Sequence, residues 1–192
     1  MSIALAYRTT LHQADELEWL IDGCTRNERG AQDKLFHMFY PRMQAMVRRY
    51  FSDEDAAQEI LSNGFLKVFR KIDQYSYRGS FEGWLRSIFR HAISDYVSQN
   101  VRYKEKVLLV EKEEYVHRDF VENLYYKDLL KLVHELPDQF RIAFNLFAIE
   151  GLSHREIAKL LGIKEGTSKW YISRAREILK EKIEELGLHL KK

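Results

Sequence analysis

Cysteine, proline and glycine are scarce in this sequence of 192 residues. The single cysteine, Cys24, excludes an internal disulfide and any metal site built from several cysteines. Two prolines and nine glycines leave few turn signals, and the alternation typical of strands is nearly absent, so we expect long helices. No apolar run is long enough to span a bilayer, and residues 1–13 are too polar for a signal peptide. We therefore expect a cytoplasmic protein without membrane insertion.

A large excess of basic charge is also missing. The net charge is only +2, although 31% of the residues are charged and 45% are hydrophobic, as in ordinary globular proteins. Residues 153–182 carry eight basic and four acidic side chains, a local charge of +4 that leaves −2 for the rest of the chain. A DNA-binding protein with so little overall positive charge is expected to need help from a partner.

The most informative pattern lies in residues 151–176, which predict a helix-turn-helix. Ser153 and Glu156 form a capping box that begins a helix, and Gly162 ends it. Thr167 is predicted to cap the second helix. The buried stripe of that helix is formed by Ile172, Ala175 and Leu179. The side chains that then face outward are Lys169, Trp170, Ser173 and Arg174. Such side chains read base edges in the major groove of DNA.

A helical hairpin with a merely solvated outer face is the alternative interpretation of these residues. We favour DNA binding because the caps, Ala158 and Gly162 fall at mutually consistent offsets. An outward-facing Trp170 is also hard to explain without a partner. Ser168 does not fit the pattern, since it lies on the inward stripe one turn before Ile172, and we expect its hydroxyl to bond back to a carbonyl.

The periodicity of the whole chain predicts an all-α protein with two small helical domains. Apolar residues at helical spacing predict helices over about 13–24, 31–50, 52–72 and 81–99, with a kink or interruption at Pro41. Residues 101–122 mix both charges without a clear apolar stripe, which indicates a solvated linker. The predicted segments are a helical bundle at 1–102, a charged linker at 103–123 and the helix-turn-helix domain at 124–192.

The loop over residues 73–80 and the helix start that follows it form the second informative stretch. Aromatic residues alternate there with Arg78 and small polar residues, which suits single-stranded DNA, because unpaired bases stack on rings and bond to hydroxyl and amide groups. Phosphates would be held by Arg86, Arg90 and Arg102. The alternative is a tyrosine-rich turn with Trp84 buried in the core, which is the stronger interpretation of the loop in isolation.

Together the two stretches resemble the sigma factors of bacterial RNA polymerase, in the sigma-70 family and its extracytoplasmic-function (ECF) group. Residues from about 31 to 102 are similar to sigma region 2, and those from about 126 to 183 to region 4. The resemblance depends on short strings in this order and spacing: 65–72 (FLKVFRKI), 79–85 (GSFEGWL), 136–137 (LP), 150–153 (EGLS), 165–167 (EGT) and 173–176 (SRAR).

The resemblance implies a role for each matching position. Contacts with the −35 promoter element are implied for Arg155, Thr167, Lys169, Trp170, Ser173, Arg174 and Arg176. Binding and melting of the −10 element are implied for Gln74, Tyr75, Ser76, Tyr77, Arg78, Trp84, Arg86 and Arg90. Docking on core polymerase is implied for the outward face of helix 52–72, at Asp55, Glu59, Ser62, Asn63 and Arg70.

The resemblance also implies partners and a mechanism. The partners are core RNA polymerase, through the β′ clamp coiled coil and the β subunit, promoter DNA, and an anti-sigma factor of the kind that holds many relatives inactive. Two tethered domains would bind two DNA elements, and tethering raises the effective concentration of the second contact. Capture of unpaired bases would drive melting, so no hydrolysis is needed.

A helix-turn-helix regulator that acts without polymerase is the nearest alternative, although the N-terminal half shows neither a heptad seam nor a sensor motif. An enzyme is the alternative from another class. Residues 117–119 (HRD) resemble a kinase catalytic loop, but Asn123 follows Asp119 by four residues rather than five, and the glycine loop is missing. The histidines show no metal-ligand spacing, so the sequence predicts no catalysis, cofactor or metal.

Overall fold

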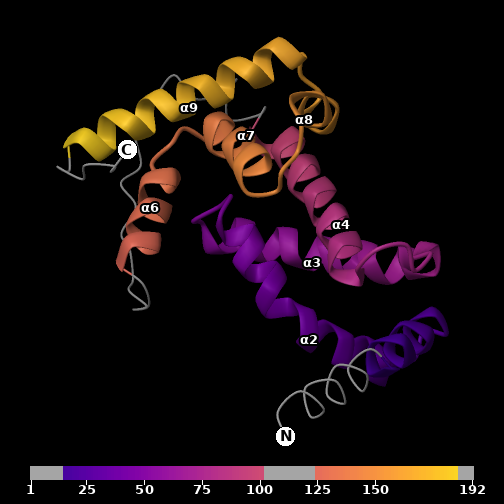
Figure 1. Ribbon diagram of the computed structural model, residues 1–192. Helices are drawn as coiled ribbons and strands as arrows, with labels where there is room; N and C mark the ends of the chain where they lie inside the picture. The colour runs from indigo at the N-terminus through magenta and orange to yellow at the C-terminus, as the bar shows by residue number, and fades with distance from the viewer. Residues whose placement is uncertain (1–14, 102–123, 186–192) are drawn as a thin grey trace, which may run out of the picture. The chain divides into compact units, whose positions relative to one another are not determined.

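The computed structural model describes residues 15–101 and 124–185, which form helices and turns and contain no strand (Figure 1). The all-α prediction is confirmed. The described residues divide into two compact units, one of residues 15–47 and 55–92 and one of residues 48–54, 93–101 and 124–185. The predicted domain boundaries stay a prediction, and the predicted linker lies outside the described residues. No described helix is both long and apolar enough to cross a membrane.

The first unit packs helices around an apolar core. They are a helix over residues 15–25, α2 (Arg29–Arg48), α3 (Glu54–Lys71) and α4 (Phe81–Tyr96). The end of α4, from Ile93, and the π-helical turn over Val97–Val101 that follows it belong to the second unit. Fully buried side chains from all four helices form the core, among them Leu20, Leu35, Met43, Leu61 and Leu85.

Pro41 lies inside α2 without interrupting it. A proline cannot donate to the carbonyl four residues earlier, which here belongs to His37. Both residues are exposed, so water can bond to that carbonyl, and the apolar face of α2 stays buried on the opposite side. The helix therefore continues through a residue that the sequence alone marks as a break.

Gly64 allows α3 and α4 to approach each other closely. A Cβ atom at this position would lie 2.4 Å from Cε1 of Phe89, and the Phe89 ring has no exposed surface. Any larger side chain at position 64 would have to push α4 away from α3. The contact thus fixes where α4 lies, and with it the loop over residues 75–80 that precedes α4.

The second unit contains α6 (Leu124–His134), α7 (Asp138–Ala148), α8 (His154–Leu161) and α9 (Glu165–Glu185). Its core is formed by Val133, Leu136, Phe140 and Ala175, with partly buried Phe144, Tyr171, Ile178 and Leu179 against it. Pro137 caps α7 from just outside the helix, and its carbonyl accepts the N–H groups of Phe140 and Arg141 at 2.9 and 3.0 Å.

Arg141 connects three segments of the second unit although its side chain is buried. Its Nε donates to the carbonyl of Tyr50 at 2.8 Å, and its Nη1 donates to the carbonyls of His134 and Leu136 at 2.9 Å each. Its Nη2 donates to the Asp138 carboxylate. Each of these carbonyls belongs to a turn or a helix end, and one guanidinium donates to all three.

Candidate nucleic-acid interfaces

The helix-turn-helix of the second unit begins and turns as the sequence predicts. The Ser153 hydroxyl accepts the Glu156 N–H at 3.3 Å, and the Glu156 carboxylate accepts the Ser153 N–H at 2.8 Å, which completes the capping box. Gly162 ends α8 with φ 65° and ψ 35°, the left-handed conformation in which glycine has no steric penalty. These caps fix the turn that leads into α9.

The start of α9 differs from the prediction. The helix begins at Glu165, so Thr167 is half-buried in its first turn and is not the capping residue. Glu165 lies 2.8 Å from Lys169, one turn further on, and this hydrogen bond lowers the pKa of the Glu165 carboxyl. An acid at a helix start also interacts favourably with the helix dipole, which lets α9 begin before the predicted cap.

Ser168 has a side-chain partner and not the carbonyl that we expected. It has no exposed surface, and its Oγ lies 3.3 Å from Nδ1 of His154, the first residue of α8. The His154 ring stacks on Phe147 with centroids 4.8 Å apart, and the Arg176 guanidinium lies 5.3 Å from the same ring. His154 therefore joins the start of α8 to α9 and α7, a role that sequence reasoning missed.

The outward face of α9 carries the predicted side chains. Lys169, Ser173, Arg174 and Arg176 are exposed, as is Arg155 on α8. Lys169 and Arg174 form ion pairs with Glu165 and Glu177, at 2.8 and 2.9 Å. Exposed pairs of this kind contribute roughly 0–1 kcal/mol, so a DNA phosphate can displace them.

Trp170 is 56% exposed but is not wholly unsupported. Its ring meets Phe140 edge to face, with centroids 5.5 Å apart and planes at 77°, and it also contacts Tyr171. Phe140 belongs to the core of the second unit, so the indole is held in one orientation by α7. The rest of the ring stays available to a partner. Packing on Phe140 and Tyr171 is enough to explain where the ring lies.

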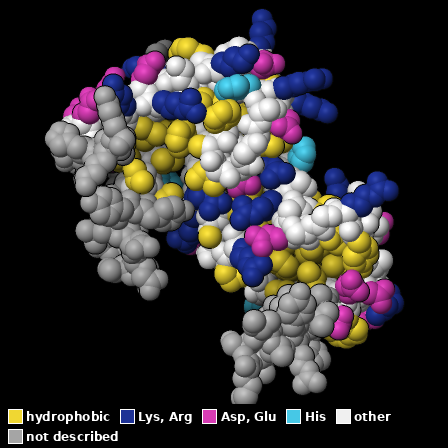
Figure 2. Space-filling model, in the orientation of Figure 1, with side chains coloured by type: hydrophobic (Ala, Val, Ile, Leu, Met, Phe, Trp, Pro, Cys, Tyr) yellow, Lys and Arg dark blue, Asp and Glu magenta, His cyan; other side chains and the backbone are white. Residues whose placement is uncertain are grey.

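A shallow hollow lies beside this face, between the start of α8 and α9. It has a volume of about 290 Å³ and is lined by His154, Lys169, Ile172, Ser173, Arg176, Glu177 and Lys180. Figure 2 shows Lys and Arg side chains projecting from the end of the second unit where α8 and the start of α9 lie. Positive charge gathered beside the outward face of α9 is suited to the phosphates that flank a major groove.

The loop of the first unit combines features of both interpretations: one of its aromatic rings packs against the protein, and the other is exposed to solvent. The Tyr75 ring is half-buried and contacts Phe81 and Trp84, with centroids 5.1 and 5.6 Å away, and its hydroxyl donates to the Gly79 carbonyl at 2.9 Å. Burial raises the pKa of the Tyr75 phenol above its ordinary value. Tyr75 and the half-buried Trp84 therefore form the base of the loop.

Tyr77 is the side chain that the loop presents to solvent. It is 55% exposed, and its backbone has φ 57°, a left-handed conformation that bulky residues rarely adopt. Strained backbone of this kind is frequent at ligand-binding loops, where the surrounding structure maintains it. The neighbouring predicted residues Gln74, Ser76 and Arg78 are exposed as well.

The start of α4 positions the predicted cationic side chains. The Ser80 hydroxyl accepts the Gly83 N–H at 3.1 Å, so Ser80 caps the helix directly after the loop. Arg86 and Arg90 follow on α4 and are both half-buried. Arg102 lies outside the described residues.

The outward face of α3 holds every residue predicted to dock on polymerase. All five are exposed: Asp55, Glu59, Ser62, Asn63 and Arg70. Leu66 lies among them with 54% of its surface exposed, and sequence reasoning missed it. Its position in the sequence could have revealed it. Leu66 lies on the polar face of the helix, between Ser62 and Arg70, where a solvent-exposed residue is normally polar.

Two family models match the chain, sigma-70 region 2 over residues 35–103 and sigma-70 region 4 over residues 126–179. The chain belongs to the sigma-70 family. Among its relatives is the ECF RNA polymerase sigma factor SigE of Mycolicibacterium smegmatis, 31% identical over 155 residues that cover 78% of this chain and 60% of SigE. The ECF RNA polymerase sigma-E factor of Haemophilus influenzae is 23% identical over 180 residues, 87% of this chain and 95% of that protein.

These relatives place this sigma-70 chain in the ECF group. A solved structure of the sigma factor RpoE in complex with the anti-sigma factor NepR, from Bartonella quintana, shares its fold, with a TM-score of 0.52 and 24% identity. The likeness covers 78% of this chain and 94% of that one. The α3 face and the tyrosine loop lie within the region 2 match, and the outward face of α9 lies within the region 4 match. The contacts assigned to individual residues stay predictions.

Proposed function

We propose that this chain binds core RNA polymerase, recognises the −35 and −10 promoter elements and promotes DNA melting in the cytoplasm without catalysing a reaction. One observation supports this proposal above all others: each unit exposes aromatic and cationic side chains of the kind that bind nucleic acid. The face of α9 lies in the region 4 segment, and the loop with Tyr77 lies in the region 2 segment. An anti-sigma factor is a further proposed partner, because the RpoE relative was solved in complex with one.

The outward face of α9 and the loop with Tyr77 suit different forms of DNA. The α9 face offers cations, an indole and a hydroxyl on a rigid helix, which suits base edges in duplex DNA. The loop offers an exposed ring over a packed aromatic base, which suits a base that has left the duplex. With a net charge of only +2, the chain relies on polymerase for further phosphate contacts and for the spacing of the two elements.

In vitro transcription tests the proposal. Core polymerase is incubated with the chain and a library of bacterial promoters, and transcript starts are mapped. We expect new start sites that appear only when the chain is present and that share two spaced elements. A chain that binds promoter DNA tightly by itself and does not join polymerase would instead be a regulator of the helix-turn-helix type.

Substitution of Trp170 or Arg174 by Ala should weaken −35 recognition and leave polymerase binding intact. Both side chains lie on the outward face of α9, and loss of a base contact costs about 1–3 kcal/mol, roughly 5- to 150-fold in affinity. Filter binding of holoenzyme to a duplex −35 fragment gives the first quantity, and co-elution with core polymerase gives the second. Arg29→Ala, an exposed cation at the start of α2, is the matched control. Loss of polymerase binding in either test variant would contradict the assignment.

Substitution of Leu66 by Glu should weaken binding to core polymerase by at least about tenfold. Burial of a leucine side chain in an interface contributes about 1.5–3 kcal/mol, and a carboxylate there would lose its hydration. Leu129→Glu on α6, where the leucine is 46% exposed, is the matched control and should bind nearly as the unmodified chain does. Equal affinities of the two variants, measured by fluorescence titration with core polymerase, would remove α3 from the docking surface.

A further inference from the structure

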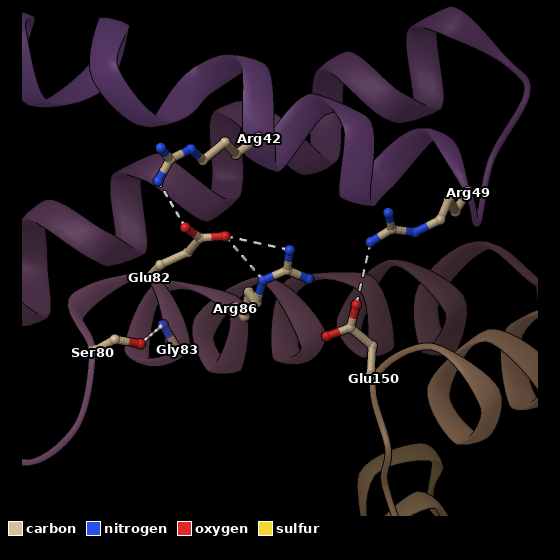
Figure 3. Close-up of polar contacts among 7 residues, drawn as sticks. All are labelled: Arg42, Arg49, Ser80, Glu82, Gly83, Arg86 and Glu150. Atoms are coloured by element: carbon tan, nitrogen blue, oxygen red, sulfur yellow. Dashed lines mark hydrogen bonds and ion pairs between the residues drawn. The ribbon is translucent and has the colours of Figure 1, made fainter. Parts of the chain in front are cut away.

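The carboxylate of Glu82 lies between two arginines of the first unit (Figure 3). Its Oε2 accepts Nη1 of Arg42 at 2.8 Å, and its Oε1 accepts both Nε and Nη2 of Arg86 at 3.3 Å. Arg42 comes from α2 and is 59% exposed, whereas Glu82 and Arg86 come from α4 and are 31% and 32% exposed. One negative charge is thus shared by two cations at the surface.

Several contacts hold Glu82 in this place. It lies in the first turn of α4, which Ser80 caps, and an acid there is favoured by the helix dipole. Arg86 follows one turn later, the favourable order for an acid–base pair on a helix. Glu82 also follows Phe81, whose ring contacts both Tyr75 and Trp84 of the loop base. The trio therefore lies directly next to the proposed site for the −10 strand.

We propose that Glu82 is a positioning residue that keeps Arg42 and Arg86 from binding single-stranded DNA indiscriminately. Its carboxylate accepts from Nη1 of Arg42 and from Nε and Nη2 of Arg86, so a strand has to displace Glu82 before a phosphate gains these donors. The inference rests on the proposed role of the loop in binding the −10 strand, and it adds a source of selectivity at that site.

The physical argument is one of competition. Without the charge of Glu82 beside them, the two arginines would attract a phosphate backbone of any sequence more strongly. With Glu82 present, each arginine–phosphate hydrogen bond replaces an arginine–carboxylate hydrogen bond of similar strength, so the net gain in binding free energy is small. A strand whose base is also captured at Tyr77 has additional binding energy with which to displace the carboxylate, and a strand without that base has none.

A purely stabilising role is the competing explanation for the same ion pairs. Arg86 and Glu82 are half-buried, so a stabilising role predicts a lower melting temperature for Glu82→Gln and no gain in DNA affinity. The two explanations differ in DNA binding. Only the proposed role predicts tighter binding to a strand of any sequence, together with a steeper dependence on salt.

The test measures binding of the full chain to dye-labelled oligothymidine by fluorescence anisotropy over a series of salt concentrations. We expect Glu82→Gln to bind about 3- to 10-fold more tightly at low salt. The slope of log affinity against log salt should become steeper by about 0.7 for each arginine released to a phosphate. Removal of one of the two guanidinium groups as well, in Arg42→Gln/Glu82→Gln, should cancel part of the gain and part of the added slope.

Asp33→Asn provides the control for loss of a negative charge alone. Asp33 is an exposed acid on α2, nine residues before Arg42. Its partner is His37, at 3.4 Å. This variant should bind oligothymidine as the unmodified chain does. Equal affinity of Glu82→Gln and the unmodified chain, including no measurable binding by either, would overturn the inference. An equal gain in Asp33→Asn would overturn it too.

A second measurement separates this inference from the proposed function. Holoenzymes with and without Glu82→Gln are compared on a strand that carries the −10 element and on a scrambled strand. We expect the variant to discriminate less between the two. If the unmodified holoenzyme does not discriminate at all, the proposed function of the loop fails; if both discriminate equally, only the role of Glu82 fails.

Discussion

Arg141→Met should destabilise the second unit by about 3 kcal/mol or more. Arg141 is only 7% exposed, and its guanidinium donates to the carbonyls of Tyr50, His134 and Leu136, as well as to Asp138. Methionine keeps the apolar length of the side chain but removes the guanidinium bonds to these carbonyls in a space from which water is largely excluded. Unsatisfied buried groups cost about 1–3 kcal/mol each, and partial relaxation reduces the sum.

Hydrogen–deuterium exchange of the full chain measures this effect unit by unit. A loss of about 3 kcal/mol should speed exchange of the amides of α7 and α9 roughly 100-fold, while the amides of α3 in the first unit keep their rates. Arg174→Met is the matched control, because it removes an arginine from an exposed position on α9 and should have little effect. Unchanged exchange in α7 would show that the carbonyls find other donors.

Arg141→Lys distinguishes charge from geometry at the same position. Lysine keeps the positive charge but places its three donors on one atom, whereas arginine directs its donors to carbonyls on separate segments. We expect the free energy of unfolding of Arg141→Lys to lie between that of the native chain and that of Arg141→Met. If the lysine variant matched the native chain, charge alone would explain the role of Arg141.

Patterns confined to one or two helical turns are readable from the sequence. The capping box at Ser153 and Glu156 and the left-handed Gly162 depend on neighbours within a few residues, so their spacing predicts them directly. The stripe of Ile172 and Ala175 is similarly local and is buried in the structure. The helical periodicity that predicts the all-α fold is local in the same way.

Roles that depend on distant partners are not readable in this way. Arg141 is one arginine among many until the carbonyl of Tyr50 lies beside it, 91 residues away in sequence. Ser168 looked like a misfit because its partner, His154, comes from another helix. Arg42 reaches Glu82 across 40 residues, and no periodicity joins them. Each of these contacts follows from packing, which the local pattern constrains only weakly.

The two loop tyrosines show the same limit, and they lead to the prediction with the largest effect on function. The sequence pattern predicts the same role for Tyr75 and Tyr77. In the structure only Tyr77 is largely exposed, whereas Tyr75 packs on Phe81 and Trp84. Tyr77→Ala should therefore impair open-complex formation by about 5- to 150-fold, because one stacked base contributes about 1–3 kcal/mol. Initial binding of holoenzyme to duplex promoter should change much less, since the base is still paired at that stage.

Permanganate footprinting of unpaired thymines measures the melted fraction, and gel mobility at low temperature measures duplex binding. Tyr77→Phe keeps the ring and should retain most of the melting. Tyr75→Ala should also impair melting, but through the loop: it removes the ring under Tyr77 and the hydrogen bond to Gly79, so the strained backbone at Tyr77 is no longer held. Undiminished permanganate reactivity in Tyr77→Ala would place the captured base elsewhere, and the exposed ring would then need another explanation.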